Sequence, residues 1–211
     1  MQTFRIALSD NHPVFSPGRL SEFPGPNLMT ATFDISKNSN DREAGPSWWV
    51  VMGVSGCGKS SLGTELARHF GLPLVEGDDF HPPANIEKMH SGIALTDADR
   101  AGWLQTLGRT LAGHAGGAVL TCSALKHAYR DTLRAAVPGL RFVFMQITPQ
   151  EALARVEARK ASHFFSSSLV DNQFATLQDP TGEAGVLPVP ATDPIDRLVQ
   201  RVQAWSAAQA G

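Results

Sequence analysis

The fold of this chain is decided by the stretch Gly53-Val54-Ser55-Gly56-Cys57-Gly58-Lys59-Ser60. The stretch matches the pattern G-x-x-x-x-G-K-[ST], whose glycines let successive backbone N–H groups turn toward one point without Cβ clashes. An apolar run at 48–52 precedes it and predicts a buried parallel strand, and residues 60–70 after it have the apolar spacing of a helix. A glycine-rich loop between a strand and a helix predicts a phosphate-binding loop, because the helix N-terminus adds positive charge there.

The residue types of this loop indicate that its ligand is a nucleoside triphosphate with Mg²⁺. Lys59 offers a mobile positive charge to the β- and γ-phosphates, and Ser60 offers a hydroxyl oxygen to the metal. Cys57 is expected to fill space rather than to act as a redox switch, because nothing in the sequence predicts a stabilised thiolate. The predicted nucleotide-binding residues are Gly53, Val54, Ser55, Gly56, Cys57, Gly58, Lys59, Ser60 and Ser61.

Strands and helices alternate along the chain from residue 47 onward. Further short apolar strands are predicted at 74–76, 118–122, 141–147 and 186–189, and helical segments lie between most of them. Pro188 suits only an edge strand, because proline cannot donate to a neighbouring strand. The Ser-rich segment 161–182 is predicted to be irregular. Alternation of this kind predicts an α/β fold with a mostly parallel sheet.

The composition excludes several classes of protein. With 42% apolar and 18% charged residues among 211, the chain is in the ordinary globular range and is neither disordered overall nor fibrous. A net charge of −2 provides no drive toward nucleic acid or anionic lipid. No apolar run approaches the ~20 residues of a membrane helix, no signal peptide is evident, and two cysteines do not make a secreted disulfide scaffold. We therefore expect a cytoplasmic enzyme or binding domain.

Residues 1–46 differ from the rest of the chain. They carry Pro13, Pro17, Pro24 and Pro26 and a polar run at 36–43, and they show no sustained helical or strand period. We expect a poorly ordered N-terminal extension over 1–46 and one folded domain over 47–211.

Acidic residues follow the second predicted strand rather than the third. No Asp or Glu comes directly after Cys122-Ser123, where a motor or GTPase usually places its Mg²⁺-associated acid, so those classes are disfavoured. Glu76, Asp78 and Asp79 instead follow the strand at 74–76, and ligands of an open parallel sheet bind beyond the carboxyl ends of its strands. Asp78 is expected to bind an acceptor hydroxyl, to accept its proton, or to hold Mg²⁺-bound water. The alternative is a solvated acidic turn, for which Gly-Asp-Asp is well suited.

Four further blocks of sequence follow the loop. They are Gly77-Asp78-Asp79-Phe80-His81-Pro82-Pro83-x-Asn85-Ile86-x-Lys88-Met89, Leu95-Thr96-Asp97-x-Asp99-Arg100-x-x-Trp103-Leu104, Cys122-Ser123-Ala124-Leu125-Lys126-x-x-Tyr129-Arg130-Asp131, and Arg159-Lys160-x-x-His163-Phe164 with Gln173-Phe174-x-x-Leu177-x-x-Pro180. Together with the loop, these blocks cover about residues 48–205 and resemble the bacterial gluconokinase family. Two departures are Ser162, where the family often has Gly, and Glu76, where it often has Asp.

The resemblance implies transfer of the γ-phosphate of ATP to D-gluconate, giving 6-phosphogluconate. It also implies Mg²⁺, a homodimer, and the P-loop kinase fold of the nucleoside monophosphate kinases and shikimate kinase, with a mobile lid at about 160–182. In this mechanism Lys59, Asp78 and Arg159 are the expected catalytic residues, and Ser60 and Asp78 are the expected metal-associated ones.

A sugar acid has a carboxylate and a row of hydroxyls, so its site needs a few cations and several hydrogen-bonding groups. The expected substrate-binding residues are Asp78, His81, Lys88, Arg100, Lys126, Arg130 and His163. Lys126 and Arg130 are four residues apart, so on one helix they share a face that an anion would stabilise. The alternative for each cation is a solvated surface position.

Arg155 and Arg159 repeat the four-residue spacing at the start of the expected lid. Arg159 is favoured for stabilising charge on the transferred phosphoryl group, because Lys160 and His163 cluster with it. The alternative is a basic helix end that complements the helix dipole.

Two other functions remain open at this point. One is a kinase for another small hydroxy acid on the same fold. The other is a nucleotide-binding regulatory module without turnover, although loss of Asp78 or of the lid cations would be its mark and these residues are present.

Overall fold

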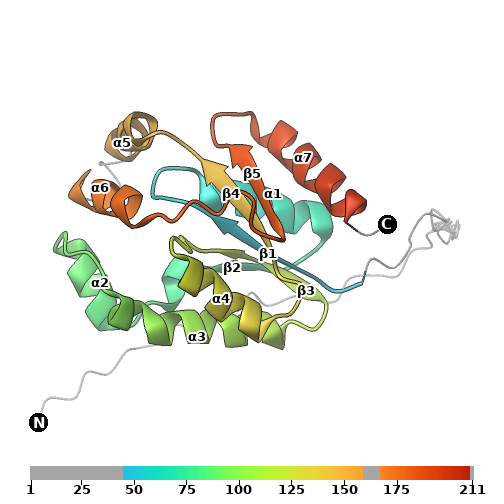
Figure 1. Ribbon diagram of the computed structural model, residues 1–211, viewed down its shortest axis with the longest axis horizontal. Coiled ribbons are helices and arrows are strands. Elements are labelled where there is room, and N and C mark those ends of the chain that lie inside the picture. Colours follow the sequence, from blue (N-terminus) through green and yellow to red (C-terminus); the bar gives the residue numbers. More distant parts are fainter. Residues whose placement is uncertain (1–44, 159–166, 210–211) are drawn as a thin grey trace, which may run out of the picture. The chain divides into compact units, whose positions relative to one another are not determined.

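The computed structural model describes residues 45–158 and 167–209, which form a parallel sheet with helices on both faces (Figure 1). The expected extension over 1–46 and the first part of the expected lid therefore lie almost entirely outside the described residues. In the described part of the chain, no helix is long and apolar enough to cross a lipid bilayer.

The sheet has five strands in the order β2-β3-β1-β4-β5, and every neighbouring pair is parallel. The strands are β1 (Ser47–Met52), β2 (Leu74–Glu76), β3 (Gly117–Thr121), β4 (Arg141–Gln146) and β5 (Val186–Pro190). This confirms the predicted parallel α/β class and places the proline-containing β5 at an edge. The connection that follows β1 leads to β2 on one side of the sheet, and the connection that follows β4 leads to β5 on the other side. The crevice beyond the carboxyl ends of β1 and β4 is therefore the expected place for a ligand.

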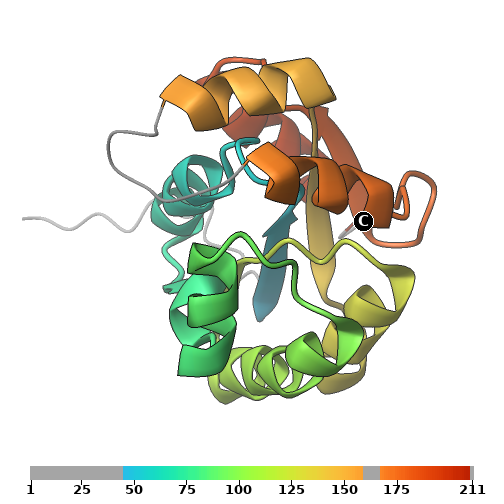
Figure 2. The same cartoon turned by 90° about the vertical axis from the view of Figure 1, so that its left-hand side faces the viewer.

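Helices cover both faces of this sheet (Figure 1). Contacts with the strands and the two buried clusters place α1 and α7 on one face and α3 and α4 on the other. Shorter helices gather toward the carboxyl ends of the strands, and Figure 2 shows α2 (green) and α6 (orange) on this side, which faces the viewer. The helices are α1 (Lys59–Phe70), the 3₁₀ turn η1 (Gly77–Phe80), α2 (Pro83–His90), α3 (Asp97–Gly113), α4 (His127–Ala136), α5 (Pro149–Ala158), α6 (Ser167–Thr176) and α7 (Ile195–Ala208).

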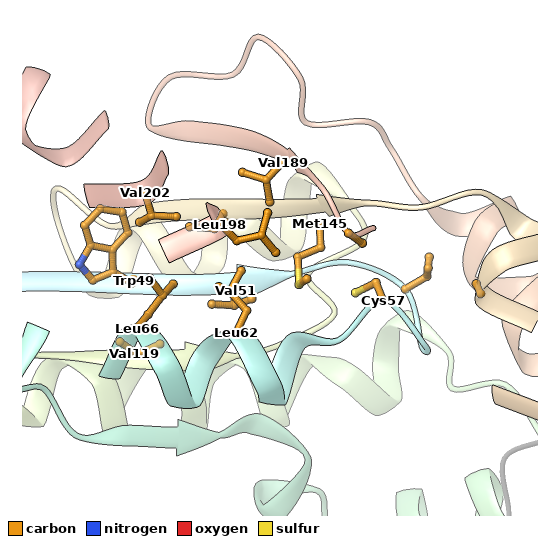
Figure 3. Packing of buried hydrophobic residues seen from close by; sticks show 14 of the residues in the cluster. Trp49, Val51, Cys57, Leu62, Leu66, Val119, Met145, Val189, Leu198 and Val202 are labelled. Atoms are coloured by element: carbon orange, nitrogen blue, oxygen red, sulfur yellow. The ribbon is translucent and has the colours of Figure 1, made fainter. Parts of the chain in front are cut away.

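The strands are buried on both faces, which explains why they are continuous apolar runs. In β1, Trp49 and Val51 point into the cluster under α1 and α7, whereas Val50 and Met52 point into the cluster under α3 and α4. Figure 3 shows Leu62 and Leu66 of α1 beside these side chains, with Leu198 and Val202 of α7 closing the same layer. The core therefore holds β1 rigidly, and the loop that follows β1 starts from a fixed point.

Helix α6 lies inside the segment that we expected to be irregular, so that expectation is wrong for Ser167–Thr176. Serines at its start have weak helix propensity, and the helix has only 10 residues. Its stability comes from packing, since Leu169 and Val170 are buried and Phe174 packs against the core under α1 and α7. Short-range sequence periodicity does not reveal a helix that depends on such long-range contacts.

Candidate functional site

Three glycines give the phosphate loop its shape. Gly53, Gly56 and Gly58 have φ angles of 143°, 84° and 99°, a region that side chains disfavour. A Cβ on Gly56 would also lie 2.7 Å from the Ala152 carbonyl oxygen of α5. Gly58 is the N-cap of α1, where no side chain caps the helix and no acidic residue occupies the first turn. The backbone N–H groups at this end are therefore left for an anion from outside the protein.

Lys59 and Ser60 begin α1 and carry the polar groups of the loop. The Lys59 Nζ donates to the Val54 carbonyl oxygen at 3.2 Å, within the loop itself. The Ser60 hydroxyl donates to Glu76 Oε2 at 3.2 Å, and Thr121 Oγ1 donates to the same carboxylate oxygen. The structure thus brings the last residues of β2 and β3 to the first turn of α1.

Glu76, rather than Asp78, is the acid that the structure places beside Ser60. The Asp78 side chain is 81% exposed, and its nearest recorded partner is His81 Nε2 at 4.0 Å. A hydroxyl and a carboxylate oxygen are the hard ligands that Mg²⁺ prefers, so Ser60 and Glu76 fit this ion. In the part of the chain that the structure describes, no group of three or more His, Cys, Asp or Glu side chains could hold a metal by itself. Such a site would need phosphate oxygens to complete it. The sequence signal for Glu76 was its place at the carboxyl end of a strand.

A cavity of about 330 Å³ adjoins the phosphate loop on the side of α5 and α7. Its lining includes Cys57, Ser61, Arg155 and Asp193. The Arg155 guanidinium donates to the carbonyl oxygens of Cys57 at 3.3 Å and Ala191 at 3.0 Å, and so joins the loop to the segment after β5. The cavity is next to the uncapped N-terminus of α1, where a nucleoside attached to the phosphates would extend.

The two cysteines of the chain are both buried. Burial raises the pKa of Cys57, and it raises the pKa of Cys122 to about 12. A thiol that remains protonated is a poor nucleophile, which agrees with the expectation that Cys57 fills space in the loop.

The turn that carries Asp78 is anchored on both sides. The His81 ring stacks on Trp103 with a centroid distance of 4.1 Å, and Trp103 Nε1 donates to the Gly77 carbonyl oxygen at 2.8 Å. A Cβ on Gly77 would lie 2.3 Å from the Thr121 carbonyl oxygen, so η1 lies directly against β3. Burial lowers the pKa of His81, which keeps its imidazole neutral near pH 7. Asp78 therefore extends toward solvent from a turn whose backbone is held in place.

The cations that we expected to bind substrate differ in what they contact. Lys88 pairs with Asp99 at 2.6 Å, and Lys126 pairs with Asp97 at 2.6 Å. The hydrogen bond from Lys88 lowers the pKa of Asp99 to about 2, and the hydrogen bond from Lys126 lowers that of Asp97. Both carboxylates are therefore charged at neutral pH, so neither lysine is an isolated positive charge.

Arg100 is only 7% exposed, yet its guanidinium forms no ion pair or hydrogen bond with the described residues. Its guanidinium lies over the Tyr129 ring at 5.9 Å, and the Tyr129 hydroxyl donates to Asp97. A buried guanidinium with unused donors is suited to a planar anion such as a carboxylate. Sequence reasoning assigned no role to Tyr129.

Arg130 is surrounded by protein partners. Its side chain is fully buried, and the guanidinium pairs with Glu183 and donates to the carbonyl oxygens of Ala124 and Leu125 at 3.0 and 3.1 Å. Lys126 is the N-cap of α4 and pairs with Asp97, whereas Arg130 pairs with Glu183, so the two cations contact different acids. The anion site expected between these two side chains is therefore not formed. Arg159, Lys160 and His163 lie outside the described residues.

Comparison with known proteins finds close relatives. The chain is 46% identical over 149 residues to a gluconokinase of Gluconobacter oxydans, covering 68% of this chain and 82% of that one. It is 40% identical over 155 residues to the thermoresistant gluconokinase of Escherichia coli, covering 72% and 88%. Protein-family models were also compared, and none matches.

Comparison with solved structures also finds a gluconokinase. A gluconokinase from Sinorhizobium meliloti superposes with a TM-score of 0.72 at 45% identity, covering 78% of this chain and 94% of that one. A shikimate kinase from Bacteroides thetaiotaomicron superposes with a TM-score of 0.53 at 17% identity, covering 76% and 98%, and shows the likeness of fold alone. The predicted P-loop kinase fold is thereby confirmed.

Proposed function

The chain belongs to the gluconokinase family, and we propose that it transfers the γ-phosphoryl group of ATP to D-gluconate, giving 6-phospho-D-gluconate. One observation carries the proposal beyond family membership. The carboxyl ends of β1 and β2 place an uncapped phosphate loop and an exposed carboxylate, that of Asp78, at the same edge of the sheet. A phosphate donor and a hydroxyl acceptor can meet there.

We assign the nucleotide to the loop and to the adjoining cavity. Residues 53–61 would hold the phosphates through the free N–H groups at the N-terminus of α1 and the Lys59 ammonium, and Arg155 borders the space for the nucleoside. Ser60 and Glu76 would hold Mg²⁺ together with phosphate oxygens. When bound, Mg²⁺ neutralises negative charge on the β- and γ-phosphates.

We assign the acceptor to the groups around η1 and the N-terminus of α3. Arg100 would bind the gluconate carboxylate, because it is the buried cation there that forms no ion pair with a described acid. Lys88, Lys126 and His81 would line the same site as polar groups for the hydroxyls. His163, which we also propose for this site, lies outside the described residues.

In the transfer itself, Asp78 orients the acceptor hydroxyl and takes its proton as the oxygen attacks the γ-phosphorus. The new P–O bond forms on one side of the phosphoryl group while the bond to ADP breaks on the other. Lys59 stabilises the charge that develops, and we propose Arg159 for the same role.

The test is a coupled assay of ADP release with Mg-ATP. D-Gluconate is compared with a panel of related sugar acids and shikimate, and a Lys59→Met variant serves as the inactive control. Turnover on gluconate alone is expected. Turnover on another acid would change the acceptor, and ATP binding without turnover on any acid would favour the regulatory module. In that last case, removal of residues 1–45 would test whether they block the site.

We further propose that the protein acts in the cytoplasm as a homodimer, as the family resemblance implies. Size-exclusion chromatography with light scattering tests the second point. A species of 22.6 kDa at micromolar concentration would count against the dimer.

A further inference from the structure

Gln173 of α6 contacts the phosphate loop from 118 residues away in the sequence. Its Oε1 accepts a hydrogen bond from the Ser55 backbone N–H at 2.6 Å. Because a backbone nitrogen can only donate, the amide oxygen must face Ser55, and Nε2 is the remaining polar atom of the side chain. Nε2 carries two N–H donors, and it has no hydrogen-bond partner among residues 45–158 and 167–209.

The contact acts on a peptide group that also concerns Lys59. The Val54 carbonyl and the Ser55 N–H belong to one trans peptide, so they point to opposite sides. Lys59 Nζ donates to that carbonyl at 3.2 Å, and Gln173 accepts from that N–H. When Lys59 turns to the phosphates, the peptide loses one of these two hydrogen bonds, and the bond to Gln173 still holds it in place.

Packing fixes the position of Gln173. Val170 is fully buried, and Phe174 packs against the core under α1 and α7. Just beyond the helix, the Gln178 N–H donates to the Leu125 carbonyl oxygen at 2.9 Å. The Gln173 amide is therefore held at the mouth of the loop by its own helix and by the chain after it.

We propose that Gln173 is a further catalytic residue, whose Oε1 holds the Val54–Ser55 peptide of the phosphate loop while its Nε2 donates a hydrogen bond to the γ-phosphoryl group of ATP. The argument rests on the proposed kinase function. Nε2 is bonded to the same carbon as the oxygen that contacts Ser55, so it lies beside the phosphate loop, and its two N–H donors are left for a phosphate oxygen. An uncharged donor suits this place, since it stabilises the moving phosphoryl group without competing with Lys59 for a counter-charge.

Two variants separate holding the loop from contacting the phosphoryl group. Gln173→Glu keeps an oxygen for the Ser55 N–H, but it removes both donors and adds a negative charge. Gln173→Met keeps the size of the side chain and removes both interactions. Asn172→Ala is the matched control, because Asn172 is exposed on the same helix.

The decisive measurement compares the affinities for ADP and for a β,γ-imido analogue of ATP, in Mg²⁺ and without gluconate. Loss of a hydrogen bond to a charged group predicts roughly 10-fold or more weaker binding of the analogue by both Gln173 variants. ADP affinity should fall clearly less than analogue affinity in Gln173→Glu, because ADP has no γ-phosphoryl group and the Ser55 contact remains. The kcat of Gln173→Glu should fall at least ~10-fold with an unchanged KM for gluconate, and Asn172→Ala should match the wild type.

Equal losses for ADP and the analogue in Gln173→Glu would overturn the proposal, since they would show support of the loop alone. Wild-type analogue affinity and kcat in Gln173→Glu would overturn it as well. If Gln173→Met does not fold, Gln173→Glu still carries the test. Failure of the proposed function would appear differently, as absence of gluconate-dependent turnover by the wild type.

Discussion

Replacement of Glu183 by Gln should destabilise the protein strongly while leaving gluconate binding nearly unchanged. The fully buried Arg130 guanidinium pairs with this carboxylate through Nε at 3.0 Å and through a second, shorter hydrogen bond. Arg134 donates to the same carboxylate at 2.8 Å. The variant keeps the shape of the side chain, removes its charge, and turns one acceptor atom into a donor that faces a guanidinium N–H.

The size of the effect follows from these contacts. Removal of one partner of a buried ion pair costs about 3–5 kcal/mol. The carbonyl oxygens of Ala124 and Leu125 and the Gln oxygen continue to accept from Arg130, so the low end, about 3 kcal/mol, applies. For a folded domain of this size, each kcal/mol shifts Tm by about 2–4 °C, which predicts a fall of about 6–12 °C.

The effect should also depend on pH. Burial acts to raise the pKa of Glu183, but hydrogen bonds from Arg130 and Arg134 outweigh it and lower the pKa from 4.5 to about 2. Above pH 4.5 the carboxylate is charged in the folded and the unfolded chain, and its full contribution to stability is present. As pH falls from 4.5 toward 2 this contribution is lost, so the Tm difference between wild type and Glu183→Gln should shrink.

Thermal unfolding followed by circular dichroism tests these expectations, together with steady-state kinetics at pH 7. Asp131→Asn is the control, because Asp131 is 51% exposed and its pairs with Arg134 at 3.1 Å and His127 at 2.7 Å are each worth at most about 1 kcal/mol. A Tm within 2 °C of wild type, which corresponds to about 0.5–1 kcal/mol, would refute the reasoning. A raised KM for gluconate without loss of stability would instead return Arg130 to the substrate site.

Three further predictions concern the site and its support. Asp78→Asn should lower kcat at least ~100-fold with little change in KM for gluconate, and an unchanged kcat in the ADP-release assay would remove Asp78 from the chemistry. Arg100→Met should raise the KM for gluconate roughly 10-fold or more without changing the KM for ATP. Arg109→Met, at an exposed position, should alter neither KM. Equal effects of the two variants would contradict the role of Arg100 in binding the carboxylate. Gly77→Ala should lower the free energy of unfolding in urea by about 1–3 kcal/mol, because its Cβ would lie 2.3 Å from a β3 carbonyl oxygen. Gly102→Ala is the control: it has open space in α3 and should raise the free energy of unfolding by about 0.5–1 kcal/mol.

The strand, loop and helix around the phosphate site follow from local sequence. The predicted strand at 48–52 and helix at 60–70 agree with β1 and α1 to within a residue. Their signals are short-range: an apolar run, glycines that accept positive φ, and a helical apolar spacing. The family could also be predicted from the sequence, because each of the four further blocks that resemble gluconokinases is contiguous in the chain.

The boundaries of helices and the interaction partners of individual side chains were harder to predict. Helix α4 starts two residues later than predicted, so Lys126 is its N-cap rather than a residue within the helix. Helix α6 was missed because its apolar residues meet their partners only in the folded chain. Gln173 stood in a family-like block, but nothing local indicates that its amide contacts Ser55, 118 residues earlier.

The sequence by itself determined the kind of ligand, since a phosphate loop needs only glycines, one lysine, one hydroxyl and a helix N-terminus within eight residues. Only the tertiary structure decided which charged side chains remain available to that ligand and its acceptor. Lys88, Lys126 and Arg130 are paired with acids 11, 29 and 53 residues away, whereas Arg100 is left without one among the described residues. Pairing of charges depends on distances in space that the folded sheet and helices set, and a linear sequence does not contain those distances.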